Sequence, residues 1–294
     1  MKLSYLIILI GMNFLWAGSL SIYKALAEHL APGSIVTLRF GVAAVLLMAL
    51  WPWLPGKAPR GADLVKTVIM GFIVFTLGHR LQVWGTKLSS AGNASVLMAV
   101  EPILTSVAAA IFLREYIGPR RWLGFVLGMF GVVLLNGFLR GGFQWAGLWA
   151  SLIFVSSFFC ESVYSIMGKP LIERSGMVKI LALALLFGTV VNLVFDGAAT
   201  LAAVRVMPLR LWWMVLYLAV ICTAVGYAIW FVVIKETDVN IVALTVFAQP
   251  VAGVLIAWLW LGEALNWGQL WGSLAIVAGL VVGLSRQVKT PAAG

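Results

Sequence analysis

The sequence predicts an all-α integral membrane protein with ten transmembrane helices, built as two inverted five-helix repeats around a central cavity, with both termini cytoplasmic. Three observations predict this fold: the composition, the number of long apolar stretches and an internal repeat. Of the 294 residues, 63% are hydrophobic and 10% are charged. An ordinary soluble domain carries about 25% charged residues, and its surface could not accommodate so much apolar area. The two cysteines are too few for a disulfide scaffold.

The long apolar stretches fix the number of helices, because a helix needs about 20 apolar residues to cross the hydrocarbon core. The first stretch follows Met1-Lys2 and could pass for a signal peptide, but it is long for that role and the repeat requires it. No connector is long enough for a separate soluble domain, and no stretch alternates like an outer-membrane strand. The ten predicted spans are residues 4–23, 34–54, 67–86, 91–113, 121–139, 145–168, 180–203, 211–233, 240–261 and 267–285.

The basic residues orient these spans, since cytoplasmic connectors of membrane proteins are enriched in Lys and Arg. Placing the N-terminus inside puts most of them on the inside: Lys2, Lys57, Arg60, Lys66, Arg114, Arg120, Arg121, Lys169, Arg174, Lys179, Lys235, Arg286 and Lys289. The outside connectors then hold only Lys24, Lys87, Arg140, Arg205 and Arg210. The net charge of +10 therefore indicates orientation rather than nucleic-acid binding, and we expect no nucleic-acid partner.

The internal repeat appears when position 78 onward is laid on position 226 onward without a gap. The matches fall at Gly, Pro and charged positions: Gly78 with Gly226, Lys87 with Lys235, Pro102 with Pro250, Glu115 with Glu263, Gly124 with Gly272, and Gly131 with Gly279. Five spans per half is an odd number, so the second half enters the membrane inverted, an architecture typical of secondary transporters. We predict a first repeat at 1–139, a connector at 140–144, a second repeat at 145–286 and a cytoplasmic tail at 287–294.

Polar side chains at membrane depth mark the expected cavity, because a charge in hydrocarbon costs at least about 2.5–3.5 kcal/mol. The repeat pairs His79 and Gln82 with Tyr227 and Trp230, and Glu101 with Gln249. The earlier spans pair Trp16 with Glu161, and Ser19 with Tyr164. The predicted substrate-binding residues are Trp16, His79, Gln82, Glu101, Glu161, Tyr164, Tyr227, Trp230 and Gln249.

Structural roles compete with this interpretation. Glu101 could instead pair with Arg39 or Arg80 and only hold helices together. His79 could be a packed core histidine. Any one aromatic residue could belong to the aromatic belts at the membrane interface instead of the cavity. We assign Trp51, Trp53, Trp212 and Trp213 to these belts.

Two prolines and two glycine pairs carry backbone predictions. Pro102 and Pro250 deprive the carbonyls of Met98 and Val246 of their helical partners, so both helices should kink. We predict that both prolines act as hinges, with a fixed bend as the alternative. The pairs Gly124/Gly128 and Gly279/Gly283 should allow close helix contact, within one chain rather than in a dimer. Glu115 and Glu263 should serve connector structure.

The proline motifs carry a family resemblance. Glu101-Pro102 and Gln249-Pro250 are each followed about a dozen residues later by Leu-Arg-Glu or Leu-Gly-Glu, and then by a Gly-rich helix. This pattern resembles the drug/metabolite transporter superfamily, specifically its ten-helix EamA-type branch, whose members mostly export small metabolites. The resemblance covers essentially the whole chain as two units. The aromatic cavity candidates look most like those of the bacterial aromatic-amino-acid exporters.

Together these features predict a multi-pass secondary transporter of the bacterial inner membrane that exports amino acids by alternating access, with aromatic or other apolar ones favoured. A broad drug or metabolite exporter of the same fold is the alternative. An integral-membrane enzyme is less favoured, because the two histidines are isolated and no dense carboxylate motif is present. We expect no cofactor and no metal. The expected partners are a small-molecule substrate and the lipid bilayer; protons are a candidate coupling ion, and facilitated diffusion is equally open, as is the oligomeric state.

Overall fold

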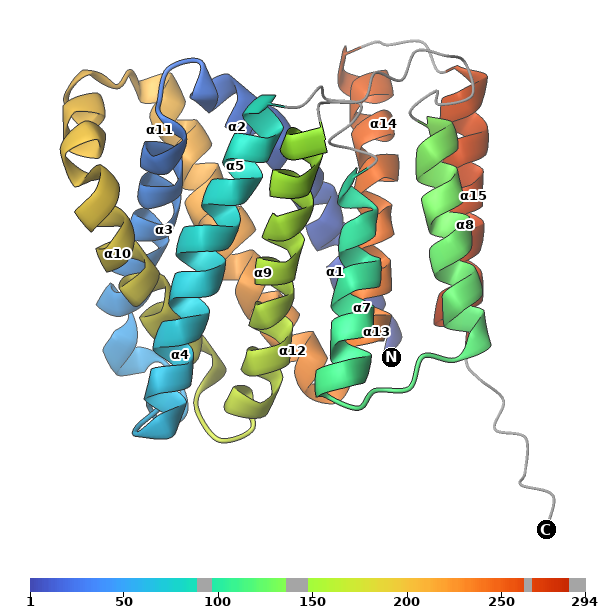
Figure 1. The fold of residues 1–294 in the computed structure, drawn as a ribbon, viewed down its shortest axis with the longest axis horizontal. Helices are drawn as coiled ribbons and strands as arrows, with labels where there is room; N and C mark the ends of the chain where they lie inside the picture. Colours follow the sequence, from blue (N-terminus) through green and yellow to red (C-terminus); the bar gives the residue numbers. More distant parts are fainter. Residues whose placement is uncertain (89–96, 136–147, 262–265, 286–294) are drawn as a thin grey trace.

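The computed structural model describes residues 1–88, 97–135, 148–261 and 266–285, and throughout these ranges the secondary structure is helical. The long helices stand side by side with their axes roughly aligned, and connectors lie at both ends of the bundle (Figure 1). Eight of the described helices are long and apolar enough to cross a membrane, and Val100–Phe112 is a shorter apolar helix. The predicted all-α, multi-pass membrane fold is thus confirmed at this level.

The first part of the chain builds its spans partly from consecutive helical segments. These are α1 (Leu3–Ala17) with α2 (Ser19–Ala27); α3 (Pro32–Ala49), followed by the short η1 (Trp51–Trp53); α4 (Ala62–Phe72), the π-helical η2 (Ile73–Gly78) and α5 (His79–Leu88); α7 (Val100–Phe112); and α8 (Pro119–Leu135). Pro32 begins α3 at a position where its missing N–H costs nothing.

The second part repeats this pattern. It comprises α9 (Leu148–Ile172); α10 (Met177–Val206); α11 (Leu209–Leu216), the π-helical η4 (Tyr217–Val225) and α12 (Gly226–Glu236); α13 (Val239–Leu244), the 3₁₀ turn η5 (Thr245–Phe247) and α14 (Ala248–Leu261); and α15 (Trp267–Leu284). A reciprocal capping box between Asn266 and Gln269 begins α15.

Each predicted span falls on described helix, although the helices often extend beyond the predicted ends. The third predicted span begins at residue 67, for example, whereas α4 begins at Ala62. Parts of the predicted spans at 91–96, 136–139 and 145–147 lie outside the described residues, as do the connector 140–144, the tail 287–294 and Glu263.

The π-helical segments were not predicted, and they occupy equivalent places in the two parts. In the alignment of position 78 on position 226, the last residue of η2, Gly78, matches Gly226, which directly follows η4. Each segment leads directly into a helix that begins with a predicted cavity residue: His79 opens α5, and Tyr227 is the second residue of α12. Such π segments occur frequently at functional sites.

Helices α8 and α15 pack backbone to backbone through glycines. A Cβ added to Gly124 would lie 2.8 Å from the Gly279 carbonyl oxygen, and one added to Gly131 would lie 2.6 Å from that of Gly272. The repeat exchanges these two contacts, because it pairs Gly124 with Gly272 and Gly131 with Gly279. The predicted close contact therefore forms within one chain.

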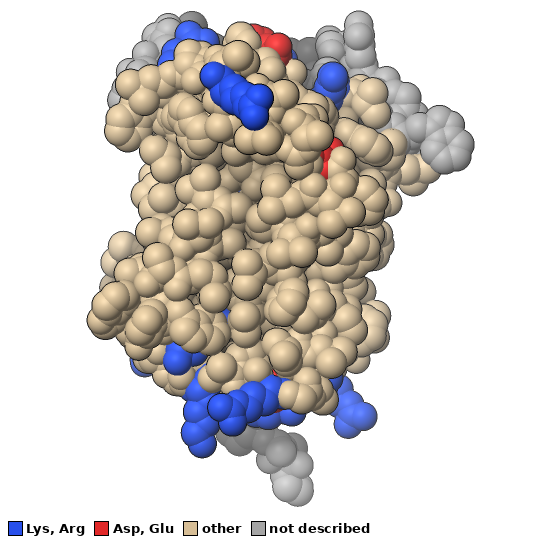
Figure 2. All heavy atoms as spheres, turned by 90° about the vertical axis from the view of Figure 1, so that its left-hand side faces the viewer, with Lys and Arg blue, Asp and Glu red and all other residues tan. Residues whose placement is uncertain are grey.

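Charges gather at the two ends of the molecule and leave an uncharged band between them on the face shown in Figure 2. Ion pairs connect segments that the charge pattern assigns to the same side: Lys2 with Glu236, Arg174 with Asp63, and Lys169 with Glu115. Glu115 also accepts hydrogen bonds from the first backbone amides of α13, at Val239 and Asn240. These connectors therefore lie at one end of the helices.

Candidate functional site

A cavity of about 90 Å³ lies among the helices, and all nine predicted site residues line it. They come from α1, α5, α7, α9, α12 and α14. Arg39 of α3 also lines it, and the remaining lining residues are Ser19, Met98, Thr105, Ser165 and Val246. The structure thus brings the predicted set together at one place.

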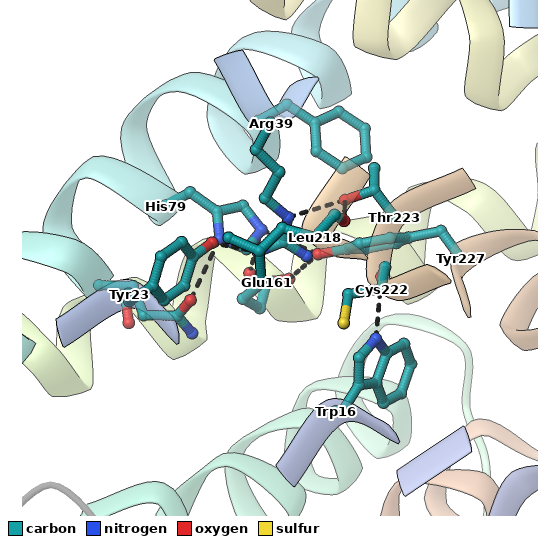
Figure 3. A network of polar contacts seen from close by, with 12 residues as sticks. Trp16, Tyr23, Arg39, His79, Glu161, Leu218, Cys222, Thr223 and Tyr227 are labelled. Carbon is teal, nitrogen blue, oxygen red and sulfur yellow. Dashed lines mark hydrogen bonds and ion pairs between the residues drawn. The ribbon is translucent and has the colours of Figure 1, made fainter. Parts of the chain in front are cut away.

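His79 and Glu161 form the polar centre of the cavity (Figure 3). Nε2 of His79 lies 2.8 Å from Oε1 of Glu161, and Nδ1 lies 3.1 Å from Oε1 of Gln82. The Tyr227 hydroxyl donates to Oε2 of Glu161 at 3.1 Å and lies 2.8 Å from Nε2 of His79. Three helices, α5, α9 and α12, therefore meet through one hydrogen-bonded cluster.

Arg39 provides a fixed positive charge beside this cluster. Its Nε donates to Oγ1 of Thr223 at 2.7 Å, and its Nη1 donates to the Tyr23 hydroxyl. The guanidinium also lies near the faces of the Tyr23 and Phe40 rings. Arg39 is 4% exposed, so its charge requires a nearby counter-charge, and Glu161 interacts with it electrostatically.

Glu101 has a different environment from Glu161. It lies in the first turn of α7 and lines the cavity, yet no hydrogen bond or ion pair joins its carboxylate to another described residue. Arg39 binds Tyr23 and Thr223, whereas Arg80 binds Asn192 and Asp196. The alternative pairing of Glu101 with Arg39 or Arg80 is therefore wrong.

Gln249, the repeat equivalent of Glu101, forms a hydrogen bond with another side chain of the protein. Its Nε2 donates to Oδ1 of Asn13 at 3.0 Å. Asn13 in turn donates to the Leu9 carbonyl and to Oγ1 of Thr245. Gln249 thus ties α14 to α1, while its relative on α7 presents a carboxyl group to the cavity without a bond to another described residue.

The aromatic residues form a second wall in which the polar tips are already bonded. Nε1 of Trp16 donates to the Cys222 carbonyl at 2.9 Å, and Nε1 of Trp230 donates to Oγ of Ser165 at 2.9 Å. The Trp16 ring centroid lies 6.0 Å from that of Trp230 and 6.3 Å from that of Tyr227. Because their polar atoms are satisfied, these rings offer the cavity mainly apolar surface.

Local backbone structure places Trp16 there. A Cβ on Gly226 would lie 2.9 Å from the Trp16 indole, so this glycine permits the close approach of α12. The indole bonds a carbonyl of the π-helical η4, in which the regular i to i−4 pattern is interrupted. Tyr164, by contrast, is 2% exposed, donates to the Tyr227 carbonyl and stacks on Phe231, so it supports the wall from behind.

Both prolines follow an interruption of the helix at the cavity. Pro102 lies in the first turn of α7, just after a turn at Ala99, and Pro250 lies in the first turn of α14, just after η5. Met98 and Val246, four residues before each proline, both line the cavity. The irregular backbone expected at the prolines is present, whereas their action as hinges stays a prediction.

Sequence reasoning missed Arg39 as a cavity residue. Its position early in a span suggested a structural partner for Glu101, and nothing local signals that Tyr23 and Thr223 hold it in the centre. Thr105 and Ser165 were also missed, because single hydroxyls are common in membrane helices.

The helical membrane fold and its polar cavity indicate a multi-pass membrane transporter, and sequence similarity identifies its family. The profile of the EamA-like transporter family matches residues 3–137 and again residues 148–284. The chain belongs to this family, which indicates a transporter rather than an enzyme.

Several proteins are similar to this chain, two of them over at least 90% of its length. An uncharacterized transporter, YdfC, of Bacillus subtilis is 26% identical over 90% of this chain and 86% of its own length. A probable terminal-alkyne amino-acid exporter of Streptantibioticus cattleyicolor is 24% identical over 94% of each chain. A probable amino-acid metabolite efflux pump of Escherichia coli is 26% identical over 65% of this chain and 67% of its own. One solved crystal structure shares the fold, with a TM-score of 0.76 at 18% identity over 96% of each chain.

Proposed function

We propose that this protein is a secondary transporter of the bacterial inner membrane that exports amino acids by alternating access, favouring those with aromatic or other apolar side chains. One observation carries the proposal: a carboxylate without a described partner, Glu101, lines the same cavity as the rings of Trp16, Tyr227 and Trp230. The names of two relatives, an amino-acid exporter and an amino-acid metabolite efflux pump, agree with this substrate class.

The substrate's charged ends have complementary groups in the cavity. Glu101 binds the ammonium group, because an ionised carboxylate at low dielectric gains strongly from a cationic partner. Arg39 binds the carboxylate group through Nη2, which bonds no described residue. The side chain of the substrate then lies against Trp16, Tyr227 and Trp230 by dispersion and ring contacts. His79, Gln82, Glu161, Tyr164 and Gln249 shape and orient these contacts.

Two inverted repeats of five helices, 1–139 and 145–286, joined at 140–144, provide the movement. The two matches to the family profile and the exchange of glycine contacts between α8 and α15 support this division. The termini face the cytoplasm, in agreement with the basic connectors gathered at one end. Bending at Pro102 and Pro250 opens the cavity to either side in turn. Opening is needed, since about 90 Å³ is well below the roughly 300–1,000 Å³ of typical small-molecule sites.

Counterflow in proteoliposomes tests the function directly. Vesicles loaded with unlabelled L-phenylalanine should transiently accumulate labelled L-phenylalanine when they contain the protein, and protein-free vesicles should not. Glu101→Gln should abolish most of this uptake, whereas Glu236→Gln, a matched change at the exposed end of α12, should leave it intact. If no amino acid supports counterflow while another solute does, the proposed substrate class is wrong.

The broader drug exporter has one observation in its favour: an acidic, aromatic cavity also suits lipophilic cations. Inhibition by tetraphenylphosphonium together with failure of every amino acid to compete would favour that alternative.

A further inference from the structure

We propose that His79 and Glu161 form the binding site for a coupling proton, so that the protein exchanges a proton for each exported amino acid. The inference rests on the proposed function for its substrate, but the proton site itself is argued from geometry. Glu161 is one of two carboxylates in the cavity lining and lies 2.8 Å from the imidazole.

Counting hydrogens in the cluster indicates a shared proton. Nδ1 of His79 faces Oε1 of Gln82, a carbonyl oxygen that only accepts, so Nδ1 carries a hydrogen. Nε2 faces Oε1 of Glu161 at 2.8 Å. Two acceptors do not approach to this distance without a hydrogen between them, so the pair holds one more proton. The Tyr227 hydroxyl supplies its own hydrogen to the other carboxylate oxygen, Oε2.

The surroundings make the site electrostatically sensitive. Besides His79, the groups facing Glu161 are Arg39 from α3, Tyr227 from α12 and Glu101 from α7, with Tyr164 and Cys160 on its own helix and Tyr23 of α2 beyond Arg39. With the shared proton bound, Arg39 and the His79–Glu161 pair carry one net positive charge opposite Glu101. When the proton leaves Nε2, the imidazole becomes neutral and the ionised Glu161 offsets the charge of Arg39.

Proton release is a simple transfer. The N–H bond at Nε2 breaks, its electron pair stays on the nitrogen, and the proton passes to water that enters the open cavity. The products are a neutral imidazole, a carboxylate and a hydronium ion, so charge and atoms balance.

Electrostatic repulsion then links proton and substrate. When both are ionised, Glu101 and Glu161 repel each other. Either the shared proton or the ammonium group of an amino acid lowers this repulsion, so binding of one weakens binding of the other. A carrier in which two ligands compete in this way exchanges them across the membrane.

Nitrogen NMR tests the proton site without any transport measurement. The chain has two histidines, so His29→Gln, a change at an exposed position, leaves His79 as the single imidazole signal. In lipid nanodiscs at low pH, both nitrogens of ¹⁵N-labelled His79 should carry hydrogen; at higher pH, Nε2 should lose it. Adding L-phenylalanine should move this transition to lower pH. A His79 that stays a neutral Nε2–H tautomer between about pH 5 and 8 overturns the proton site.

Transport under a pH gradient tests the exchange. With the membrane potential clamped, one-for-one exchange drives accumulation of L-phenylalanine up to about tenfold per pH unit, because each unit is about 1.4 kcal/mol. Glu161→Gln should remove the response to the gradient, and Glu101→Gln should weaken both the affinity and the response, because it removes the repulsion that links the two sites. Wild-type counterflow that ignores the gradient overturns the exchange while leaving the proposed substrate in place. Absence of counterflow itself would instead overturn the proposed function.

Discussion

The two walls of the cavity stand at equivalent places in the repeat but carry different chemistry. On α5 and α7 the wall presents His79, Gln82 and Glu101, whereas on α12 and α14 the equivalent positions are Tyr227, Trp230 and Gln249. The first wall is ionisable; the second is aromatic and, at Gln249, bonded to Asn13. A repeated scaffold has thus produced a cavity with one polar and one apolar side, which fits a molecule that has a charged end and an apolar end.

The largest expected effect on substrate binding comes from Glu101→Gln, which gives α7 the same residue that α14 carries at the equivalent position, Gln249. Glu101→Gln should weaken L-phenylalanine binding by about 1.5–3 kcal/mol, roughly 10- to 150-fold, because a charged hydrogen bond is lost. The concentration dependence of counterflow measures this loss. An affinity within twofold of the wild type would show that Glu101 does not bind the substrate.

A smaller effect should follow from removing a ring of the aromatic wall. Trp230→Ala should weaken binding of L-phenylalanine by about 0.5–1.5 kcal/mol, roughly 2- to 13-fold, and leave L-alanine nearly unaffected. Trp230→Phe is the control, since it keeps an aromatic face and loses only the bond to Ser165. Competition assays with both amino acids provide the comparison, and equal losses for the two substrates would contradict an apolar wall.

The hydrogen bond between Gln249 and Asn13 should contribute to the stability of the fold rather than to substrate binding. Asn13→Leu removes the hydrogen bond to Gln249, and such bonds between membrane helices contribute on average about 0.6 kcal/mol. We expect a slightly lower melting temperature in detergent and an unchanged affinity for L-phenylalanine. A large loss of affinity with unchanged stability would place Asn13 in the binding site instead.

The smallest effect is expected far from both walls, at the exposed pair of Lys2 and Glu236. The hydrogen bond and charge of Glu236 raise the pKa of Lys2 above its usual value. A raised lysine pKa stabilises the fold at all pH values below the unfolded pKa, and this contribution is lost only as the pH rises through the folded pKa. Lys2→Ala should therefore not change how melting temperature varies between about pH 6 and 8. A changed profile in that range would show that this pair influences the cavity.

Much of the cavity was predictable, because a rare polar residue in an apolar span needs a cavity or a partner, and the repeat doubles that signal. It singled out His79 with Gln82 and, opposite them, Tyr227 with Trp230. Most of the helix spans were predictable from length and hydropathy alone, and eight of the described helices are long and apolar enough to cross a membrane.

Other features depend on distant contacts that no local pattern encodes. The central position of Arg39 follows from Tyr23 and Thr223, which lie on two other helical segments. The π-helical segments η2 and η4 do not differ in amino-acid composition from the α-helical spans around them, so the sequence predicts ordinary α-helix there. Likewise, the presence of Arg39 and Arg80 in neighbouring spans suggested a pairing with Glu101 that does not form, since Arg80 is bonded to Asp196 on α10.

The central claim, that one wall binds the ammonium group and the other the apolar side chain, is tested most directly with a pair of competitors. Inhibition of labelled L-phenylalanine counterflow is measured with L-phenylalanine and with 3-phenylpropionate, which lacks the ammonium group, in wild type and in Glu101→Gln. The wild type should bind L-phenylalanine at least about tenfold more tightly than 3-phenylpropionate, and Glu101→Gln should remove most of that difference. An equal effect of the substitution on both competitors would contradict the assignment of Glu101 to the ammonium group.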